Sequence, residues 1–158
     1  MIDGGEDPLF ICRRMIILAA EDIGLANPNA LLMANACFTA VHNIGMPEGR
    51  ILMAQTAIYL SCSAKSNSAY MAIEKALGEV KSRLNVPIPL HLRNAPTQLM
   101  KELGYGKDYQ YAHDFSGNFV DMNYLPEELG NISFYTPGDN PAEEKNKILM
   151  SRFKGNKL

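Results

Sequence analysis

The chain has no tryptophan and only three cysteines among its 158 residues. Cysteines so few and so widely spaced exclude a disulfide framework and indicate a reducing compartment. No uninterrupted apolar stretch approaches the roughly 18 residues that a membrane-spanning helix requires. The N-terminus also lacks the basic stretch and the apolar run of a signal peptide. We therefore expect a soluble protein of the cytoplasm.

A strong excess of charge of either sign is also missing. The 15 lysines and arginines and the 17 aspartates and glutamates give a net charge of −2. This balance argues against a strongly basic nucleic-acid clamp and against an acidic tail. Basic residues are in mild excess over residues 64–114. Apolar residues make up 47% of the sequence, which predicts a globular domain with a buried core.

Signals for helix starts and ends recur through the first half of the chain. Asp7-Pro8 combines an N-cap residue with proline at the first helical position, and Asn27-Pro28 repeats this arrangement. Gly24 and Gly45 are suited to helix ends. We expect helices over residues 9–20, 27–43, 47–63 and 66–84.

The last of these helices carries a regular apolar stripe. Its members recur at helical spacing and are Tyr70, Ile73, Ala76, Leu77 and Val80. Charged residues occupy its other faces, so the stripe is predicted to be buried.

The character of the chain changes after residue 85. Pro87 and Pro89 push their predecessors into extended conformations, which predicts an extended strap over residues 86–94. A short helix over 96–103, an aromatic-rich irregular region up to residue 135 and a charged helix over 143–154 follow. The predicted fold is therefore all-α: a bundle of about five helices with a proline-rich strap and an aromatic-rich irregular C-terminal part. Residues 1–85 would form the helical core, 86–135 would pack on it, and 136–158 would be a polar tail that can form a helix.

Motifs for nucleotide hydrolysis and metal binding are lacking. A phosphate-binding loop requires Gly-Lys followed by Ser or Thr, whereas Gly106-Lys107 is followed by Asp108. The cysteines Cys12, Cys37 and Cys62 lie 25 residues apart, unlike the close pairs that bind zinc. We therefore expect no cofactor site and no metal site.

One pair of residues could act in catalysis. His113 is followed by Asp114, and a histidine oriented by a carboxylate can serve as a general base. Adjacent residues on an irregular loop rarely point at each other, and no nucleophile accompanies them. Structural hydrogen bonding is the favoured interpretation, and we expect no catalytic residue.

Several residues are candidates for contacts with an anion, DNA or a partner protein. The candidates are Lys65, Ser66, Asn67, Arg93, Lys107, Tyr111 and His113. The first three would stand at a helix N-terminus, where free N–H groups attract anions, although ordinary capping explains them as well. Arg93 could grip a carboxylate or phosphate or could pin the strap internally. The tyrosines near Lys107 resemble a stacking surface for single strands, and aromatics covering a core give the same pattern.

A second set of candidates lies on the first helix, which is apolar on two sides. A helix of a domain core normally leaves one face to water, so we expect this helix to mediate self-association. Arginines on one face, with two acidic residues about two turns further on, could pair with an antiparallel partner across a symmetric contact. The same pairs could also close within one subunit. The candidate oligomer interface consists of Arg13, Arg14, Ile16, Leu18, Glu21 and Asp22.

Long segments of this chain resemble one known family over roughly residues 2–135. The segments are GGEDPLFICRR at 4–14, AEDIGLA at 20–26, GMPE at 45–48, YL at 59–60, KSN at 65–67, PLHLRNAP at 89–96, LMKELGYGK at 99–107, YAHD at 111–114 and YLP at 124–126. They are similar to the C-terminal domain of the replication-associated recombination protein A family (RarA, also called MgsA). These proteins are relatives of the Werner-helicase-interacting ATPase.

The resemblance implies a function for the parent protein. Members of the family are clamp-loader-like AAA+ ATPases that act at stalled replication forks, in recombination and in repair. They bind ATP with Mg in an ATPase core, bind DNA, associate with single-stranded-DNA-binding protein and assemble as homotetramers. The resemblance implies that this chain is an excised C-terminal fragment without the ATPase core, located in the bacterial cytoplasm at the nucleoid. The family's catalytic residues have no counterparts in this chain.

Three functions compete at this point. The first is an oligomerisation domain, a tetramerisation domain in this family, of a replication-fork ATPase. The second is a DNA- or partner-docking helical module without catalysis of its own, and the third is an enzyme that uses His113 and Asp114. The mass in solution separates the first from the others, and salt-dependent binding to single strands would support the second.

Overall fold

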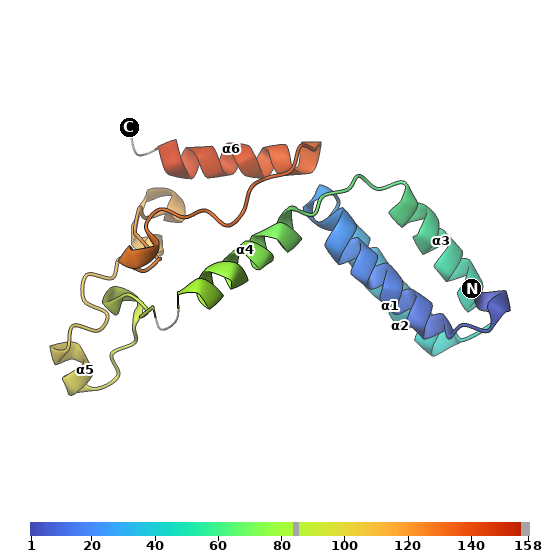
Figure 1. The fold of residues 1–158 in the computed structure, drawn as a ribbon, viewed down its shortest axis with the longest axis horizontal. Coiled ribbons are helices and arrows are strands. Elements are labelled where there is room, and N and C mark those ends of the chain that lie inside the picture. Colours follow the sequence, from blue (N-terminus) through green and yellow to red (C-terminus); the bar gives the residue numbers. More distant parts are fainter. Residues whose placement is uncertain (84–85, 156–158) are drawn as a thin grey trace. The chain divides into compact units, whose positions relative to one another are not determined.

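Six α-helices account for the regular structure of residues 1–83 and 86–155, which are the residues that the computed structural model describes (Figure 1). This part of the chain contains no strand, so the predicted all-α class is confirmed. The helices are α1 (Pro8–Leu18), α2 (Asn29–Ile44), α3 (Gly49–Ser61), α4 (Ser68–Ser82), α5 (Gln98–Glu102) and α6 (Pro141–Gly155).

The helices belong to two compact units. The first unit consists of residues 1–75 together with 134–148, and the second of residues 76–133 together with the residues from 149 onward. Both α4 and α6 begin in the first unit and end in the second. Two helices therefore connect the units.

Helix α1 begins and ends as its sequence predicts. The Asp7 carboxylate accepts hydrogen bonds from the backbone N–H groups of Leu9 (3.0 Å) and Phe10 (3.1 Å), with Pro8 at the first helical position. After Leu18 the helix widens into a π-helical turn over Ala19–Ile23. Gly24 ends this turn with a φ of 49°, a conformation that residues with a Cβ rarely adopt.

The core of the first unit lies where α1, α2 and α3 meet. Ile11 and Cys12 of α1 pack with Cys37 and Val41 of α2 and with Met53 of α3. A second cluster continues the core at the other end of these helices. Its members are Ala19, Ile23, Ala30, Ala34 and Leu60. Small side chains dominate the α2 positions, which lets the helices approach closely.

The predicted start of α2 is wrong in one respect. Asn27 does not cap the helix: its side-chain amide donates to the Tyr59 hydroxyl (3.2 Å) and the Ser63 hydroxyl (3.0 Å). A long-range contact with the end of α3 thus replaces the local cap. The predicted end is confirmed, because Gly45 follows α2 with a φ of 75°.

Helix α4 differs from expectation in its burial. Tyr70, Ile73, Leu77 and Val80 are exposed and Ala76 is half-buried, so the predicted buried stripe is wrong. The apolar periodicity is present, but the described residues do not cover this face. The predicted end of the helix at residue 84 lies outside the described residues.

The second unit is mostly irregular. Residues 86–89 adopt neither helix nor strand, and a 3-10 turn at Leu90–Leu92 interrupts the predicted strap. Helix α5 is shorter than predicted and begins after Thr97, whose hydroxyl accepts a hydrogen bond from the N–H of Met100 (3.3 Å). The rings of Phe119 and Phe153 stack with centroids 4.7 Å apart and so tie the end of α6 to the irregular region.

Candidate functional site

The outward faces of α2 and α3 are apolar and carry almost no charge. Between Pro28 and Ala64 the only charged residues are Glu48 and Arg50. Large side chains are nevertheless exposed: Leu32 to 68%, Ile51 to 62% and Ile58 to 66%.

Small or neutral residues stand between these side chains. They are Asn35, Ala36 and Thr39 on α2 and Ala54, Gln55 and Ala57 on α3, and all are exposed. Ile51 and Ile58 are seven residues apart, so they lie on one face of α3, two turns from each other. Several large apolar side chains exposed on one nearly uncharged surface are typical of sites where proteins bind one another.

The residues predicted for the oligomer interface on α1 divide into two groups. Arg13, Arg14, Glu21 and Asp22 are exposed, the last two within the π-helical turn. Ile16 and Leu18 are half-buried and pack against the second core cluster. The charged residues are therefore open to a partner, whereas the two apolar residues contribute to the core of their own unit.

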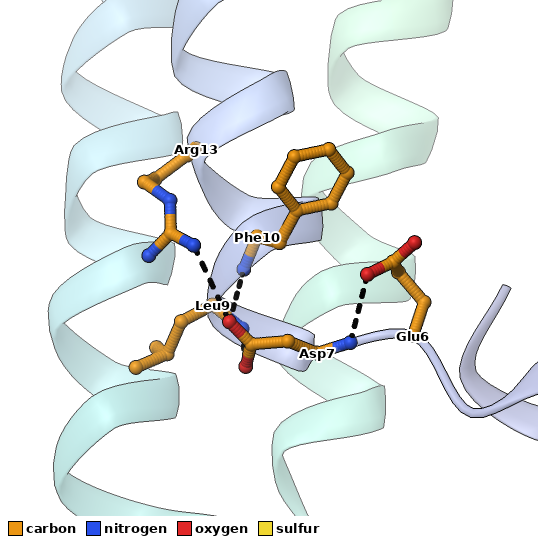
Figure 2. A network of polar contacts seen from close by, with 5 residues as sticks. All are labelled: Glu6, Asp7, Leu9, Phe10 and Arg13. Atoms are coloured by element: carbon orange, nitrogen blue, oxygen red, sulfur yellow. Dashed lines mark hydrogen bonds and ion pairs between the residues drawn. The ribbon is translucent and has the colours of Figure 1, made fainter.

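Arg13 also makes contacts within its own chain (Figure 2). Its Nη2 atom lies 3.3 Å from a carboxylate oxygen of Asp7, and its guanidinium carbon lies 5.9 Å from the centre of the Phe10 ring. The same Asp7 carboxylate caps α1. Both partners of the ion pair are about half-exposed, so the pair contributes less than about 1 kcal/mol.

The three candidate residues before α4 have different environments. Lys65 and Asn67 are exposed, whereas Ser66 is buried. The backbone N–H of Ser66 donates to the carbonyl of Asp22 (2.8 Å), and its hydroxyl accepts from the N–H of Ser68 (3.3 Å). Ser66 thus joins this turn to the end of α1, and only Lys65 and Asn67 face solvent.

Arg93 holds the strap in place. Its Nε donates to the carbonyl of Ile88 (2.7 Å), its Nη1 donates to the hydroxyl of Tyr105 (3.2 Å), and its guanidinium lies 5.1 Å from the centre of that ring. These contacts match the interpretation in which the arginine pins the strap internally. They also fix the guanidinium in one place.

A cleft of about 450 Å³ opens next to Arg93 in the second unit. Its lining residues are His91, Leu92, Arg93, Asn94, Ala95, Gly106, Tyr109 and Tyr124. Both tyrosines are about half-exposed, and no carboxylate belongs to this lining. Tyr124 was not among the candidate residues, because nothing in the sequence near it indicates that it lies close to Arg93.

The remaining candidates of the aromatic loop, Lys107, Tyr111 and His113, lie outside this lining. Lys107 lines a second hollow, of about 340 Å³, which also includes His91. The rings of Tyr111 and His113 contact each other, with centroids 5.1 Å apart and planes tilted by 49°. His91 Nε2 is within hydrogen-bonding distance of the carbonyl of Asn123 (2.9 Å). The structure therefore brings Arg93 and His91 to the cleft and leaves Tyr111 and His113 as an exposed pair.

Two features are lacking over residues 1–83 and 86–155. No group of three or more His, Cys, Asp or Glu side chains is arranged as a metal site there. No helix there has both the length and the apolar character needed to cross a membrane.

The thiols of Cys12 and Cys37 contact each other in the core. Burial and, to a smaller extent, the neighbouring Cys37 together raise the pKa of Cys12 to about 11. Because the thiolate is the reactive form, we expect Cys12 to be inert.

The most extensive polar cluster surrounds Glu143, which sequence reasoning missed. This carboxylate is completely buried, with 0% of its surface exposed. It accepts hydrogen bonds from the hydroxyls of Ser68 (2.6 Å) and Tyr135 (2.8 Å), the N–H of Gly138 (2.9 Å) and the side-chain amide of Asn140 (2.9 Å). The only available sequence signal was Asn140 three residues before Glu143, a pattern of helix starts.

Comparison with known proteins identifies the family. The family described as "MgsA AAA+ ATPase C terminal" matches residues 1–154. This chain belongs to that family. It is 47% identical over 155 residues to "Replication-associated recombination protein A" of Coxiella burnetii, covering 98% of this chain and 35% of that protein. It is 40% identical over 146 residues to the protein of the same name in Escherichia coli K12, covering 92% of this chain and 33% of that protein.

A eukaryotic relative matches as well. The chain is 46% identical over 136 residues to "ATPase WRNIP1" of Dictyostelium discoideum, which covers 85% of this chain and 16% of that protein. The predicted resemblance to the RarA family is thus confirmed. The chain spans about a third of the length of the bacterial relatives named above. It corresponds to the C-terminal domain of a AAA+ ATPase family involved in replication-associated recombination.

Proposed function

We propose that this chain is a non-catalytic oligomerisation domain that assembles a AAA+ ATPase into a homotetramer. The observation that carries this proposal is the nearly chargeless, apolar outward surface of α2 and α3. Leu32, Ile51 and Ile58 each expose about two thirds of their surface to water. Burying such a side chain contributes about 1–2 kcal/mol, so a stable contact would also use the neighbouring exposed residues of both helices.

A second copy of this chain is the occupant that best fits this surface. Neutral faces require no partner of complementary charge, and symmetric contacts place the same patch on both subunits. The exposed charges of α1 offer an alternative contact. There Arg14 would pair with Glu21 or Asp22 of an antiparallel partner.

Matched substitutions on the two surfaces test the proposal. In the double variant Ile51→Lys/Ile58→Lys we expect the dissociation constant to rise at least about 100-fold, because each change places a charge in the contact. The control Ile17→Lys places one such charge on the outward face of α1, where Ile17 is exposed. Sedimentation velocity measures the mass, and circular dichroism verifies that each variant remains helical.

The outcomes separate the surfaces. A helical, monomeric double variant beside an oligomeric Ile17 variant supports assembly through α2 and α3. An oligomeric double variant beside a helical, monomeric Ile17 variant assigns the contact to α1. A wild-type chain that is monomeric at high micromolar concentration refutes oligomerisation altogether.

The parent protein is proposed to act in replication-fork maintenance, recombination and repair as a clamp-loader-like ATPase. Its names in the bacterial relatives refer to replication-associated recombination, and its eukaryotic relative is named an ATPase. ATP and Mg would bind in an ATPase core outside this chain. DNA and single-stranded-DNA-binding protein would be partners of the parent, in the cytoplasm at the nucleoid.

The tyrosine-lined cleft favours a second candidate function, the docking of single-stranded nucleic acid. Tyr109 and Tyr124 could stack on bases, and Arg93 is held where a phosphate could reach it. Since the net charge is −2, we expect weak binding, with dissociation constants of about 10⁻⁴–10⁻⁶ M that increase with salt.

Titration of a labelled oligothymidylate tests this candidate. We expect the change Tyr109→Ala/Tyr124→Ala to weaken binding about tenfold or more, because each lost stacking contact is worth about 1–3 kcal/mol. The control Phe115→Ala removes an exposed ring that is not part of the cleft lining. An equal loss of affinity in the double variant and in the control, or no loss of affinity in either, would argue against the cleft as the binding site.

A further inference from the structure

The cluster around Glu143 joins segments that are far apart in the sequence. Ser66 and Ser68 stand just before and at the start of α4, whereas Tyr135, Gly138 and Asn140 precede α6. Ser68 and Glu143 are separated by 75 positions. One buried carboxylate therefore holds the C-terminal segment 134–148 to the turn that precedes α4.

Neutral donors alone surround this carboxylate among the contacts described. One carboxylate oxygen, Oε2, accepts from Ser68, Tyr135 and Gly138, and the other, Oε1, accepts from Asn140. Asn140 also accepts from the N–H of Glu143 (3.0 Å), so these two residues cap α6 reciprocally. Tyr135 is held by a further hydrogen bond from Asn146 (3.3 Å). A buried charge held only by such dipoles is strongly destabilised once its donors move away.

The turn to which the cluster is attached is itself tightly fixed. The N–H of Ser66 donates to the carbonyl of Asp22, and a Cβ atom at Gly24 would lie 2.6 Å from the carbonyl oxygen of Ser66. A Cβ atom at Gly138 would lie 2.8 Å from the Ser66 hydroxyl and 2.9 Å from a Glu143 oxygen. Glycine at 138 therefore permits the close approach that the cluster requires.

We propose that Glu143 is a latch that docks the C-terminal segment 134–148 onto the turn that precedes α4. The latch is a single carboxylate, and its opening releases the segment while the core of α1, α2 and α3 stays folded. The core clusters contain no residue of segment 134–148, so they do not depend on it for their packing. This inference is independent of self-association.

Glu143→Gln is the sharpest test of the latch. A glutamine fills the same volume but turns one acceptor oxygen into a donor. The hydroxyls of Ser68 and Tyr135 can rotate to accept from it, whereas the N–H of Gly138 cannot. If the NH2 group of the glutamine takes the place of Oε2, it faces the N–H of Gly138, and two donors meet. If it takes the place of Oε1, it faces the side-chain NH2 group of Asn140, which is also a donor.

Hydrogen exchange with the full chain provides the readout. In Glu143→Gln we expect amides of residues 66–71 and 134–142 to exchange at least about tenfold faster, while amides of the α1–α3 core keep their wild-type rates. The matched control is Glu144→Gln, because Glu144 is exposed on the same helix and pairs only with Lys147 at the surface among the contacts described (3.5 Å). The control should exchange like the wild type.

Two other results would overturn the latch. Unchanged exchange in residues 134–142 of the glutamine variant would show that the carboxylate does not hold the segment. Exchange that rises equally in the α1–α3 core would show a residue of global stability instead. Should the glutamine variant fail to fold, Gly138→Ala inserts one methyl group into the same cluster and is judged by the same exchange pattern.

Discussion

Acid should remove the stabilisation that Glu143 gives to the folded state. Burial acts to raise the pKa of Glu143, but the hydrogen bonds from Ser66, Ser68, Gly138 and Asn140 outweigh it and lower the pKa from 4.5 to about 2. The folded chain thus binds the proton less readily than the unfolded chain. The resulting stabilisation is complete above the unfolded pKa and disappears as the pH falls through 4.5 toward 2.

The magnitude follows from the size of this shift. At about 1.4 kcal/mol for each pH unit, the shift corresponds to about 3 kcal/mol of stability at neutral pH. The variant Glu143→Gln lacks this contribution at every pH. The free energy of opening the segment 134–148 should therefore differ between wild type and variant by about 3 kcal/mol at pH 7, and the difference should shrink toward zero near pH 2.

Hydrogen exchange of the amides of residues 134–142, converted to a free energy of opening at each pH, measures this difference. Effects of pH that the two proteins share cancel when the two are compared. Glu144→Gln serves as the control and should follow the wild type at each pH. A difference between wild type and Glu143→Gln that stays constant from pH 7 to pH 2.5 would refute the reasoning, because it would show that the charge of Glu143 is not responsible.

Three further outcomes are expected. Asp7→Ala removes the cap of α1 and should lower the free energy of unfolding by about 1 kcal/mol in a thermal melt, whereas Asp7→Asn should lose much less. Gly24→Ala should lower the free energy of unfolding by more than about 2 kcal/mol, because the φ at this position is 49° and the new Cβ would press on the Ser66 carbonyl. The control Gly78→Ala lies within α4 with open space around it, and it should leave the free energy of unfolding unchanged or raise it. A thiol reagent should label Cys62 in the native protein and the two buried thiols only after unfolding; rapid labelling of all three would contradict the core packing.

Local signals explain which parts of the fold could be predicted. The cap at Asp7 and the glycine at 45 act on neighbouring residues, so the helix limits that they define are confirmed. Asn27 has the same pattern as that cap, yet its amide bonds to Tyr59 and Ser63, which are 32 and 36 positions away along the chain. A short stretch of sequence around Asn27 does not show that distant residues compete with the helix N-terminus for its side chain.

The candidate site shows the same division between local and distant information. The sequence shows that the helices are apolar, but the spacing of apolar residues does not tell which side of a helix faces a neighbour. Ile16 packs against the core of its own unit, whereas Ile58 is exposed to water. The sequence indicates only a charged helix around Glu143, because its partner Ser68 is 75 positions away. Apart from Asn140 three residues before it, nothing in the adjoining sequence distinguishes it from Glu144, which is exposed.

The scarcity of charge on α2 and α3 has a consequence for the choice of partner. Related chains usually reject one another through like charges or unpaired charges at the contact, and these faces contain almost none. If assembly uses them, discrimination rests on shape alone, and shape is easily shared between close relatives. A cell that expresses two such paralogues should therefore contain mixed assemblies, in proportions set by their abundance and little affected by ionic strength.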